Sequence, residues 1–206
     1  GGGPDQNLIL LDGVPVYNVD HLLGFFSVFT PEAVKKVTLF KSSFPARFGG
    51  RLSSVIDVRT NDGDMKNYHG VVSVGLLTSK INFEGPIIKN RTSFNISARR
   101  SYIDLLAKPF MPKDEKYSYY FFDVNAKINH KFSDRSRLFL SAYNGKDHFM
   151  TKYDDTYYGD EDKYRDGGKM NWGNTIVSGR WNYIFNNKLF SNTTVAFNNY
   201  KFDVST

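Results

Sequence analysis

Long runs in which apolar and polar residues alternate dominate the second two-thirds of the sequence. Alternate side chains of a strand point to opposite faces, so each run predicts a β-strand with one apolar and one polar face. The run at 119–132 shows the pattern most clearly, with Phe122, Val124, Ala126 and Ile128 alternating with Asp123, Asn125, Lys127 and Asn129. Six runs have this character and cover residues 68–76, 80–86, 91–102, 119–132, 137–145 and 172–185. A seventh run, 189–204, is long and strand-like, but its pattern does not assign its faces.

The lengths of these runs and of their connections favour a membrane barrel. Most runs reach the roughly 9–11 residues that cross a bilayer as a tilted strand, whereas strands of soluble proteins average about 5–6 residues. Short connections at 87–90, 133–136 and 186–188 alternate with long polar ones at 103–118 and 150–170, although the one at 77–79 is short. Tight turns on one rim and long loops on the other are typical of outer-membrane barrels. A soluble β-sandwich is the alternative.

The first sixty residues predict a small mixed α/β module. Residues 37–60 form its centre, with two short strands joined by a turn-rich crossing in which Gly49 and Gly50 permit a sharp change of direction. Residues 8–18 predict a hairpin around the Asp12-Gly13 turn. The apolar segment 21–29 predicts a buried loop or short helix. Thr30-Pro31-Glu32 has the residues of a helix start and predicts a helix over 31–36.

Composition excludes several classes of protein. The chain has a net charge of +6 in 206 residues, but its basic residues are scattered, which indicates ordinary surface charge and no nucleic-acid partner. It has no cysteine, so disulfides and thiolate sites are excluded. It also has no helix-length apolar run and no visible signal peptide. The absence of such a run does not argue against barrel strands, whose hydropathy signal is weak.

The catalytic and metal-binding patterns in the sequence are weak. Asp12, His21 and Ser27 supply the residue types of a catalytic triad, but they lie in an apolar stretch without a nucleophile elbow. The four histidines are far apart and lack the spacing of metal ligands. No phosphate-binding loop accompanies the glycine pair. We therefore expect no enzyme activity, no cofactor and no metal site.

The tyrosine- and aspartate-rich segment 153–168 is the most suggestive candidate for ligand binding. Its acids lack the spacing of a calcium-binding loop, and a solvated extracellular loop is the simpler interpretation. Its aromatic rings could stack on a sugar or an aromatic ligand. The candidate ligand-binding residues are Tyr153, Asp154, Asp155, Tyr157 and Tyr158. Near a tight turn, Trp181, Tyr183 and Phe185 fall on one face and suit an aromatic belt at a membrane interface.

Three segments carry a family resemblance. DQNLILLDGVPVYN at 5–18 and HLLGFFSVFTPEAVKKVTLFKSSFPARFGGRLSSVIDVRT at 21–60 resemble the C-terminal half of the plug of TonB-dependent outer-membrane receptors of the Bacteroidota type. GVVSVGLLTSKINFEGPIIKNRTSFNISARRSYIDLL at 70–106 is similar to the first barrel strands of that family. From residue 107 onward the resemblance depends only on the alternating strands and long loops that are typical of a barrel.

The resemblance implies a fold and a function. The fold is mainly β. Residues 1–62 form part of a plug domain, and residues 63–206 form about seven strands of an antiparallel transmembrane barrel. The full barrel of the family has about 22 strands, so the resemblance implies that the others follow residue 206. The function is energised uptake of a siderophore, cobalamin, oligosaccharide or peptide across a Gram-negative outer membrane. Its partners are TonB, which would bind a segment before residue 1, and, as a further candidate, a surface lipoprotein. Arg99 and Arg180, on polar faces, are expected to pair with plug acids.

Three interpretations stay open at this stage. The odd strand count and the unpaired last strand indicate a fragment of a receptor. An outer-membrane barrel for adhesion, binding or assembly, without energised transport, is the first alternative. A soluble all-β carbohydrate-binding protein or enzyme is the second.

Overall fold

A computed structural model describes residues 6–41, 45, 48–49, 53–112, 115–155 and 164–206. The N-terminal module contains β1 (Asn7–Leu11), β2 (Val14–Pro15), β3 (Asp20–His21), η2 (Leu22–Gly24), β4 (Phe26–Ser27), η3 (Pro31–Ala33), β5 (Val34–Lys41) and β6 (Ser54–Thr60). It is followed by β7 (His69–Val74), β8 (Thr78–Ile88), β9 (Thr92–Ser101), α1 (Ile103–Ala107), η4 (Lys108–Phe110), β10 (Glu115–Ser133), β11 (Ser136–Asp155), β12 (Tyr164–Asn186) and β13 (Leu189–Ser205). The chain is thus mainly β.

The module is built on a four-stranded sheet in the order β2-β1-β6-β5. Strands β1 and β6 are parallel, and the other two pairs are antiparallel. Asp12 and Gly13 both have positive φ (50° and 89°), as a tight two-residue turn requires, so the predicted hairpin is confirmed. Pro15 lies on the edge strand β2, where the missing N–H does not interrupt the sheet.

One expectation for the module is wrong. The helix predicted over 31–36 is only the single turn η3, Thr30 makes no side-chain cap, and the chain enters β5 at Val34. A helix so short contributes little stability, and pairing of β5 with β6 outweighs the capping signal. The change of direction expected at Gly49 and Gly50 stays a prediction, because Gly50 lies outside the described residues; Gly49 itself has no positive φ.

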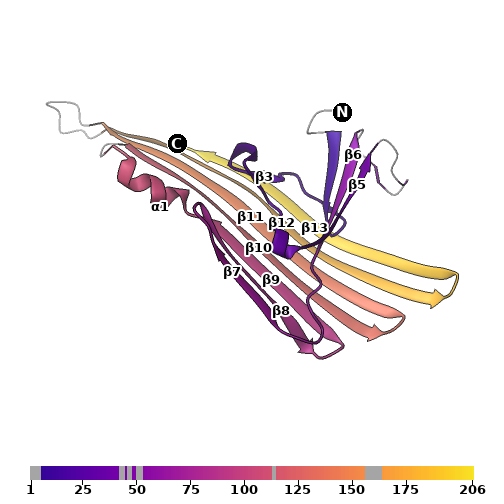
Figure 1. Ribbon diagram of the computed structural model, residues 1–206. Coiled ribbons are helices and arrows are strands. Elements are labelled where there is room, and N and C mark those ends of the chain that lie inside the picture. Colours follow the sequence, from indigo (N-terminus) through magenta and orange to yellow (C-terminus); the bar gives the residue numbers. More distant parts are fainter. Residues whose placement is uncertain (1–5, 42–44, 46–47, 50–52, 113–114, 156–163) are drawn as a thin grey trace.

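Strands β7 to β13 form one antiparallel sheet in which every strand pairs with its neighbours in sequence. The seven predicted strands are confirmed, and β10 to β13 have 19, 20, 23 and 17 residues. The short turns β8–β9, β10–β11 and β12–β13 lie together at the lower right of Figure 1. No helix in the described part of the chain is long and apolar enough to cross a membrane.

The predicted long loops are shorter than expected. The segment 103–118 contains α1 and η4 before β10 begins at Glu115. Most of 150–170 is strand, because β11 ends only at Asp155 and β12 begins at Tyr164. The ladder depends on backbone hydrogen bonds, so it continues past the point where the apolar alternation stops.

The two faces of the large sheet differ sharply. We call the face that carries the module the inner face and the opposite one the outer face. Buried inner residues are mostly polar: Asn82, Ser93, Asn95, Ser97, Asp123, Asn125, Lys127, Asn129, Asp147, Asn174 and Ser178. Exposed outer residues are apolar: Ile81, Phe83, Ile96, Val124, Ile128, Leu140, Val177, Trp181, Val195 and Phe197.

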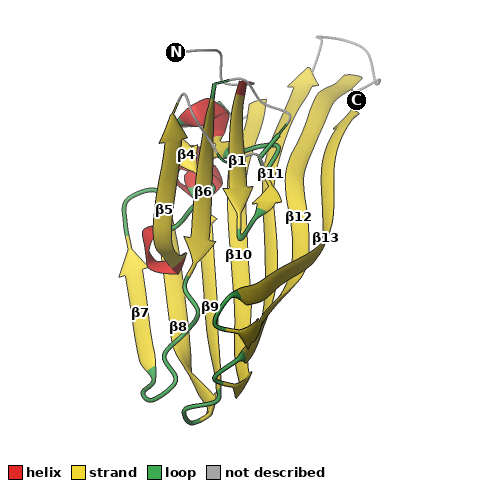
Figure 2. Cartoon of the chain, turned by 90° about the vertical axis from the view of Figure 1, so that its right-hand side faces the viewer, coloured by secondary structure: helices red, strands yellow, loops and turns green. Residues whose placement is uncertain are grey.

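The apolar core lies between the module and the inner face. Figure 2 shows the small sheet standing in front of the large one. The core residues are Leu11, Val14, Val16, Val28 and Val58 of the module, with Tyr143 and Ile176 of the large sheet. This core is small, and polar contacts make up much of the remaining interface.

Candidate functional site

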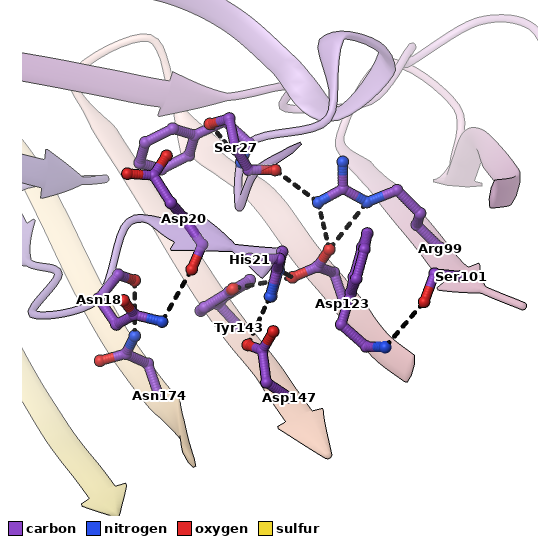
Figure 3. A network of polar contacts seen from close by, with 12 residues as sticks. Asn18, Asp20, His21, Ser27, Arg99, Ser101, Asp123, Tyr143, Asp147 and Asn174 are labelled. Carbon is purple, nitrogen blue, oxygen red and sulfur yellow. Dashed lines mark hydrogen bonds and ion pairs between the residues drawn. The ribbon is translucent and has the colours of Figure 1, made fainter. Parts of the chain in front are cut away.

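His21 of the module is buried between two carboxylates of the large sheet. It ends β3, and the two-residue pairing of β3 with β4 directs its ring toward the inner face. Nδ1 lies 2.7 Å from Asp147 Oδ2, and Nε2 lies 2.8 Å from Asp123 Oδ1 (Figure 3). All three side chains are at most 1% exposed. We call these residues, with Arg99, Tyr119 and Tyr143, the His21 cluster.

Asp123 is the most connected member of the His21 cluster. Arg99 of β9 donates to Asp123 Oδ2 from Nε at 2.8 Å and also from Nη2, and Tyr143 Oη donates to Oδ1 at 2.9 Å. Tyr143 reaches this carboxylate across Gly145, where a Cβ would collide with the Tyr143 hydroxyl. The glycine is therefore required by the geometry of the cluster.

The second carboxylate, Asp147, is linked to the module by two routes. It accepts a hydrogen bond from the hydroxyl of Tyr119, and the same hydroxyl accepts one from the backbone N–H of Leu22 at 2.6 Å. His21 provides the other route. Asp147 therefore holds both the side chain at the end of β3 and the turn that follows it.

The charges of the His21 cluster balance only when the imidazole is protonated. Burial alone would lower the pKa of His21, but its hydrogen bonds to Asp123 and Asp147 and their negative charges raise it above the ordinary value of 6.5. In the imidazolium form both ring nitrogens donate, and the two cations His21 and Arg99 match the two carboxylates. Neutral His21 would leave one buried negative charge uncompensated.

The aromatic ring of Phe121 packs against both cations of the His21 cluster. The ring of Phe121 stacks on His21 with centroids 4.2 Å apart and planes 5° from parallel. The Arg99 guanidinium lies 5.1 Å from the same ring, on which it can make a cation–π contact. Phe121 is fully buried, so water does not reach this part of the cluster.

A second cluster, around Lys127 of β10, has the opposite arrangement of charge. Here the large sheet supplies the cation and the module side supplies the acids. Lys127 Nζ lies 3.1 Å from Asp12 Oδ1, 3.0 Å from the carbonyl oxygen of Thr60 and 2.8 Å from Asp62 Oδ1. These three acceptors match the three N–H groups of an ammonium. We call Lys127, Asp12, Thr60 and Asp62 the Lys127 cluster.

The two acids of the Lys127 cluster are held in place from the module side. Asp12, in the β1–β2 turn, also accepts hydrogen bonds from the backbone N–H and the hydroxyl of Thr60. Asp62 pairs with Lys35 at 2.6 Å. Burial would raise the pKa of Asp62, but the charges of Lys127 and Lys35 lower it, so the carboxylate stays ionised.

Smaller contacts extend the interface along the chain. Lys80 of β8 pairs with Glu32 at 2.5 Å, and Asn174 Nδ2 donates to the carbonyl oxygen of Asn18 at 2.8 Å. Gly63 has a φ of 78° and approaches the Phe94 backbone so closely that a Cβ would collide with it. The module is thus joined to β8, β9, β10, β11 and β12 by hydrogen bonds, ion pairs or close packing.

The two arginines expected at the interface lie on the inner face. Arg99 donates from Nη2 to the carbonyl oxygen of Ser27 in the module at 2.6 Å, but its carboxylate partner is Asp123 of β10 and not an acid of the module. The Arg180 guanidinium lies 4.5 Å from the Phe139 ring and lines a cavity of about 740 Å³ that Asp12, Arg59 and Asp62 also line.

The structure does not assemble the other sequence-derived candidates into a site. Tyr153, Asp154 and Asp155 lie at the end of β11, where only the backbone is described, and Tyr157 and Tyr158 lie outside the described residues. Asp12 and His21 belong to different clusters, while Ser27 Oγ accepts the backbone N–H of Phe29. Across the described residues, no group of three or more His, Asp and Glu side chains is arranged to hold a metal.

Four interface residues are not predicted from the sequence: His21, Lys127, Asp123 and Asp147. A signal for them exists, because Asp123 and Lys127 sit at polar positions of an otherwise apolar alternation, and Asp147 continues the same pattern on β11. Their partners could not be found from spacing, since His21 is 102 and 126 residues away from the two acids.

Comparisons with known proteins give structural neighbours only. No protein-family profile and no curated protein sequence matches the chain. A siderophore receptor, PirA from Acinetobacter baumannii, aligns over 95% of this chain and 40% of its own, with 13% identity and a TM-score of 0.47. A mutant of the ferric enterobactin receptor PfeA from Pseudomonas aeruginosa aligns over 94% and 37%, with 12% identity and a TM-score of 0.47. The PirA receptor from Pseudomonas aeruginosa aligns over 98% and 42%, with 17% identity and a TM-score of 0.45. The chain spans about 40% of the length of these structures.

Proposed function

We propose that this chain is part of a TonB-dependent outer-membrane receptor, with residues 1–62 forming the later half of the plug and 63–206 the first seven strands of the barrel wall. The whole receptor would import a nutrient using energy delivered through TonB. This assignment combines the motif resemblance at 5–106 with the geometry of the interface between the module and the sheet.

The reversed polarity of the large sheet is the observation that carries the proposal. In a soluble protein the apolar face of a sheet is buried and the polar face meets water. Here the polar face is buried under the module, while Val177, Val195 and Phe197 on the opposite face are 49%, 73% and 60% exposed. An apolar face of this extent, on strands of 17 residues and more, fits lipid as its surroundings.

Aromatic side chains near the short turns agree with a membrane boundary. Trp181, Tyr183 and Phe185 form a row of edge-to-face contacts on β12, with ring centroids 5.7 and 4.7 Å apart. Trp181 also donates from Nε1 to Ser136 Oγ at 3.0 Å, so its polar edge is satisfied while its ring is half exposed. In the proposed receptor these rings lie at the periplasmic interface.

The two clusters would hold the plug inside the wall in a form that can be released. Buried ion pairs contribute little net stability compared with apolar packing, because desolvation offsets their attraction. Water entering the interface can replace their hydrogen bonds, whereas a large apolar core would resist opening. A pulling force transmitted through TonB could therefore displace the plug without unfolding the wall.

The ligand and the surface partners belong to the same proposal. The candidate ligand classes are siderophore, cobalamin, oligosaccharide and peptide. The candidate contacts lie on the rim opposite the short turns and are Tyr153, Asp154, Asp155, Tyr157 and Tyr158. A surface lipoprotein that closes this rim is a further candidate partner. Arg99 and Arg180 are proposed to act between plug and wall and not on the ligand.

Cell fractionation tests the proposed function. An antibody against the peptide 154–165 should label intact cells and detect a species in the outer-membrane fraction whose gel mobility changes on boiling. Growth on the limiting nutrient should depend on both this protein and TonB. Growth that needs the protein but not TonB would instead favour a barrel without energised transport, and a soluble species would contradict the membrane assignment.

A further inference from the structure

The outer face changes from apolar to polar along β11, β12 and β13, and a hollow of about 250 Å³ lies on the polar side of this boundary. The strand register places Val177 and Phe197 side by side in the apolar part. Two residues further along lie Thr175 and Asn199, and two beyond these lie Gly173 and Lys201, with Lys146 on the other side of Gly173. The hollow therefore begins within about 7 Å of the apolar part, one pair of residues along a strand.

Two lysines flank the hollow, and nothing projects between them. Lys146 and Lys201 are separated by the strand that carries Gly173, which places their backbones roughly 10 Å apart. A side chain at Gly173 would collide with the backbone of Gly145, so the space between the lysines stays open. An anion of the size of a phosphate group could be reached by both ammonium groups.

The lysines of the hollow have no carboxylate partner. In the part of the chain that the structure describes, neither Lys146 nor Lys201 forms an ion pair or a hydrogen bond through its ammonium group. Arg100, which lies level with them on β9, differs, because it pairs with Asp104 at 3.1 Å and lies 4.9 Å from the ring of Tyr120. Asp203 also lines the hollow, on the side away from the apolar part, so the net charge of its lining is +1.

We propose that Lys146 and Lys201 bind the phosphate of a membrane-lipid headgroup whose acyl chains lie along the apolar outer face. This inference rests on the proposed function, since it needs the outer face to meet lipid. The order of side chains along β12 and β13 matches the order of groups in a phosphorylated lipid. Apolar residues meet the chains, Thr175 and Asn199 meet the polar linkage, and the lysines meet the phosphate.

Bound lipid on the purified receptor tests the proposal. The full-length protein, extracted from outer membranes in mild detergent, is exchanged into nanodiscs of phosphatidylcholine with a minor share of bisphosphorylated lipid A. Lipid A retained per protein is measured by native mass spectrometry. The K146Q/K201Q variant is compared with Lys188→Gln, which removes the same charge from an exposed turn on the opposite rim. The variant K146R/K201R keeps the charge.

The expected result is a loss of lipid A affinity of about fivefold for each lysine, with no change for Lys188→Gln and recovery in K146R/K201R. Equal retention by K146Q/K201Q and the wild type would overturn the site. Displacement of lipid A by millimolar inorganic phosphate would overturn the lipid assignment, because a headgroup held by its chains resists such competition. Gel mobility on boiling is measured for every variant. If it changes in all of them, the barrel is folded, and a failure of the lipid site would not be a failure of the proposed function.

Discussion

The His21 and Lys127 clusters hold the module to the same sheet with opposite distributions of charge. At His21 the module supplies the cation and the sheet supplies Asp123 and Asp147. At Lys127 the sheet supplies the cation and the module side supplies Asp12 and Asp62. Both clusters are buried, but only the His21 cluster contains a histidine, the residue type whose ordinary pKa lies near neutral pH. The comparison suggests that loss of a proton from His21 can weaken one cluster, whereas the other depends on the charge of Lys127.

Replacing the cation of the Lys127 cluster should have the largest effect. Lys127→Met keeps much of the side-chain volume but leaves Asp12 and Asp62 buried without their common partner. Breaking a buried ion pair from one side costs about 3–5 kcal/mol. Because the chain has no cysteine, a fluorophore on Tyr17→Cys, an exposed position of the module, can report the urea concentration that releases the module. An unchanged release midpoint would show that the Lys127 cluster does not hold the module.

Raising the pH should weaken the His21 cluster selectively. The pKa of His21 is raised in the folded protein, so its stabilisation is complete below the unfolded value of about 6.5 and is lost as pH rises through the raised pKa. The urea concentration at which the label on Tyr17→Cys reports release of the module should therefore fall as the pH rises through the raised pKa of His21. His21→Gln should remove the dependence, whereas Lys127→Met should keep it. A midpoint equally pH-dependent in His21→Gln would assign the titration to another group.

Removing one neutral donor from the His21 cluster should have a smaller effect. Tyr143→Phe deletes the hydrogen bond to Asp123, which retains Arg99 and His21 as partners. Hydrogen bonds to charged groups contribute about 1.5–3 kcal/mol, so the release midpoint should fall less than for Lys127→Met. The matched change Tyr183→Phe, on the outer face, should leave the midpoint unchanged. Equal losses for the two variants would point to packing and not to the hydrogen bond.

The smallest effect is expected at the exposed edge of the Lys127 cluster. Lys35 pairs with Asp62 but is 57% exposed, and exposed pairs contribute about 0–1 kcal/mol. Lys35→Ala should shift the release midpoint within that range, and the shift should shrink in high salt. If Lys35→Ala lowered the release midpoint as much as Lys127→Met does, the pairing of Asp62 with Lys35 would matter for docking as much as its buried contact with Lys127.

The sequence predicts the sheet well and the interface poorly, for a physical reason. Alternation is local, so the seven strands and the faces of residues such as Val124 and Asp123 follow from spacing alone. The strand ends do not, because β11 and β12 continue as a ladder where the alternation has stopped. The partners of His21 and Lys127 cannot be predicted in this way. His21 and Asp123, like Lys127 and Asp12, lie more than a hundred positions apart in the chain, and no local pattern encodes such contacts.

The most direct test of the proposal that the outer face meets lipid uses the two tryptophans of the chain. Trp181 lies half exposed on the outer face, whereas Trp172 lies on the inner face near Tyr119. In the proposed receptor, reconstituted in vesicles that contain brominated lipid, Trp172→Phe should leave the lipid-quenched fluorescence unchanged, and Trp181→Phe should reduce it. If brominated lipid quenched neither tryptophan, the outer face would not meet lipid and the account of a plug docked on a membrane wall would be contradicted.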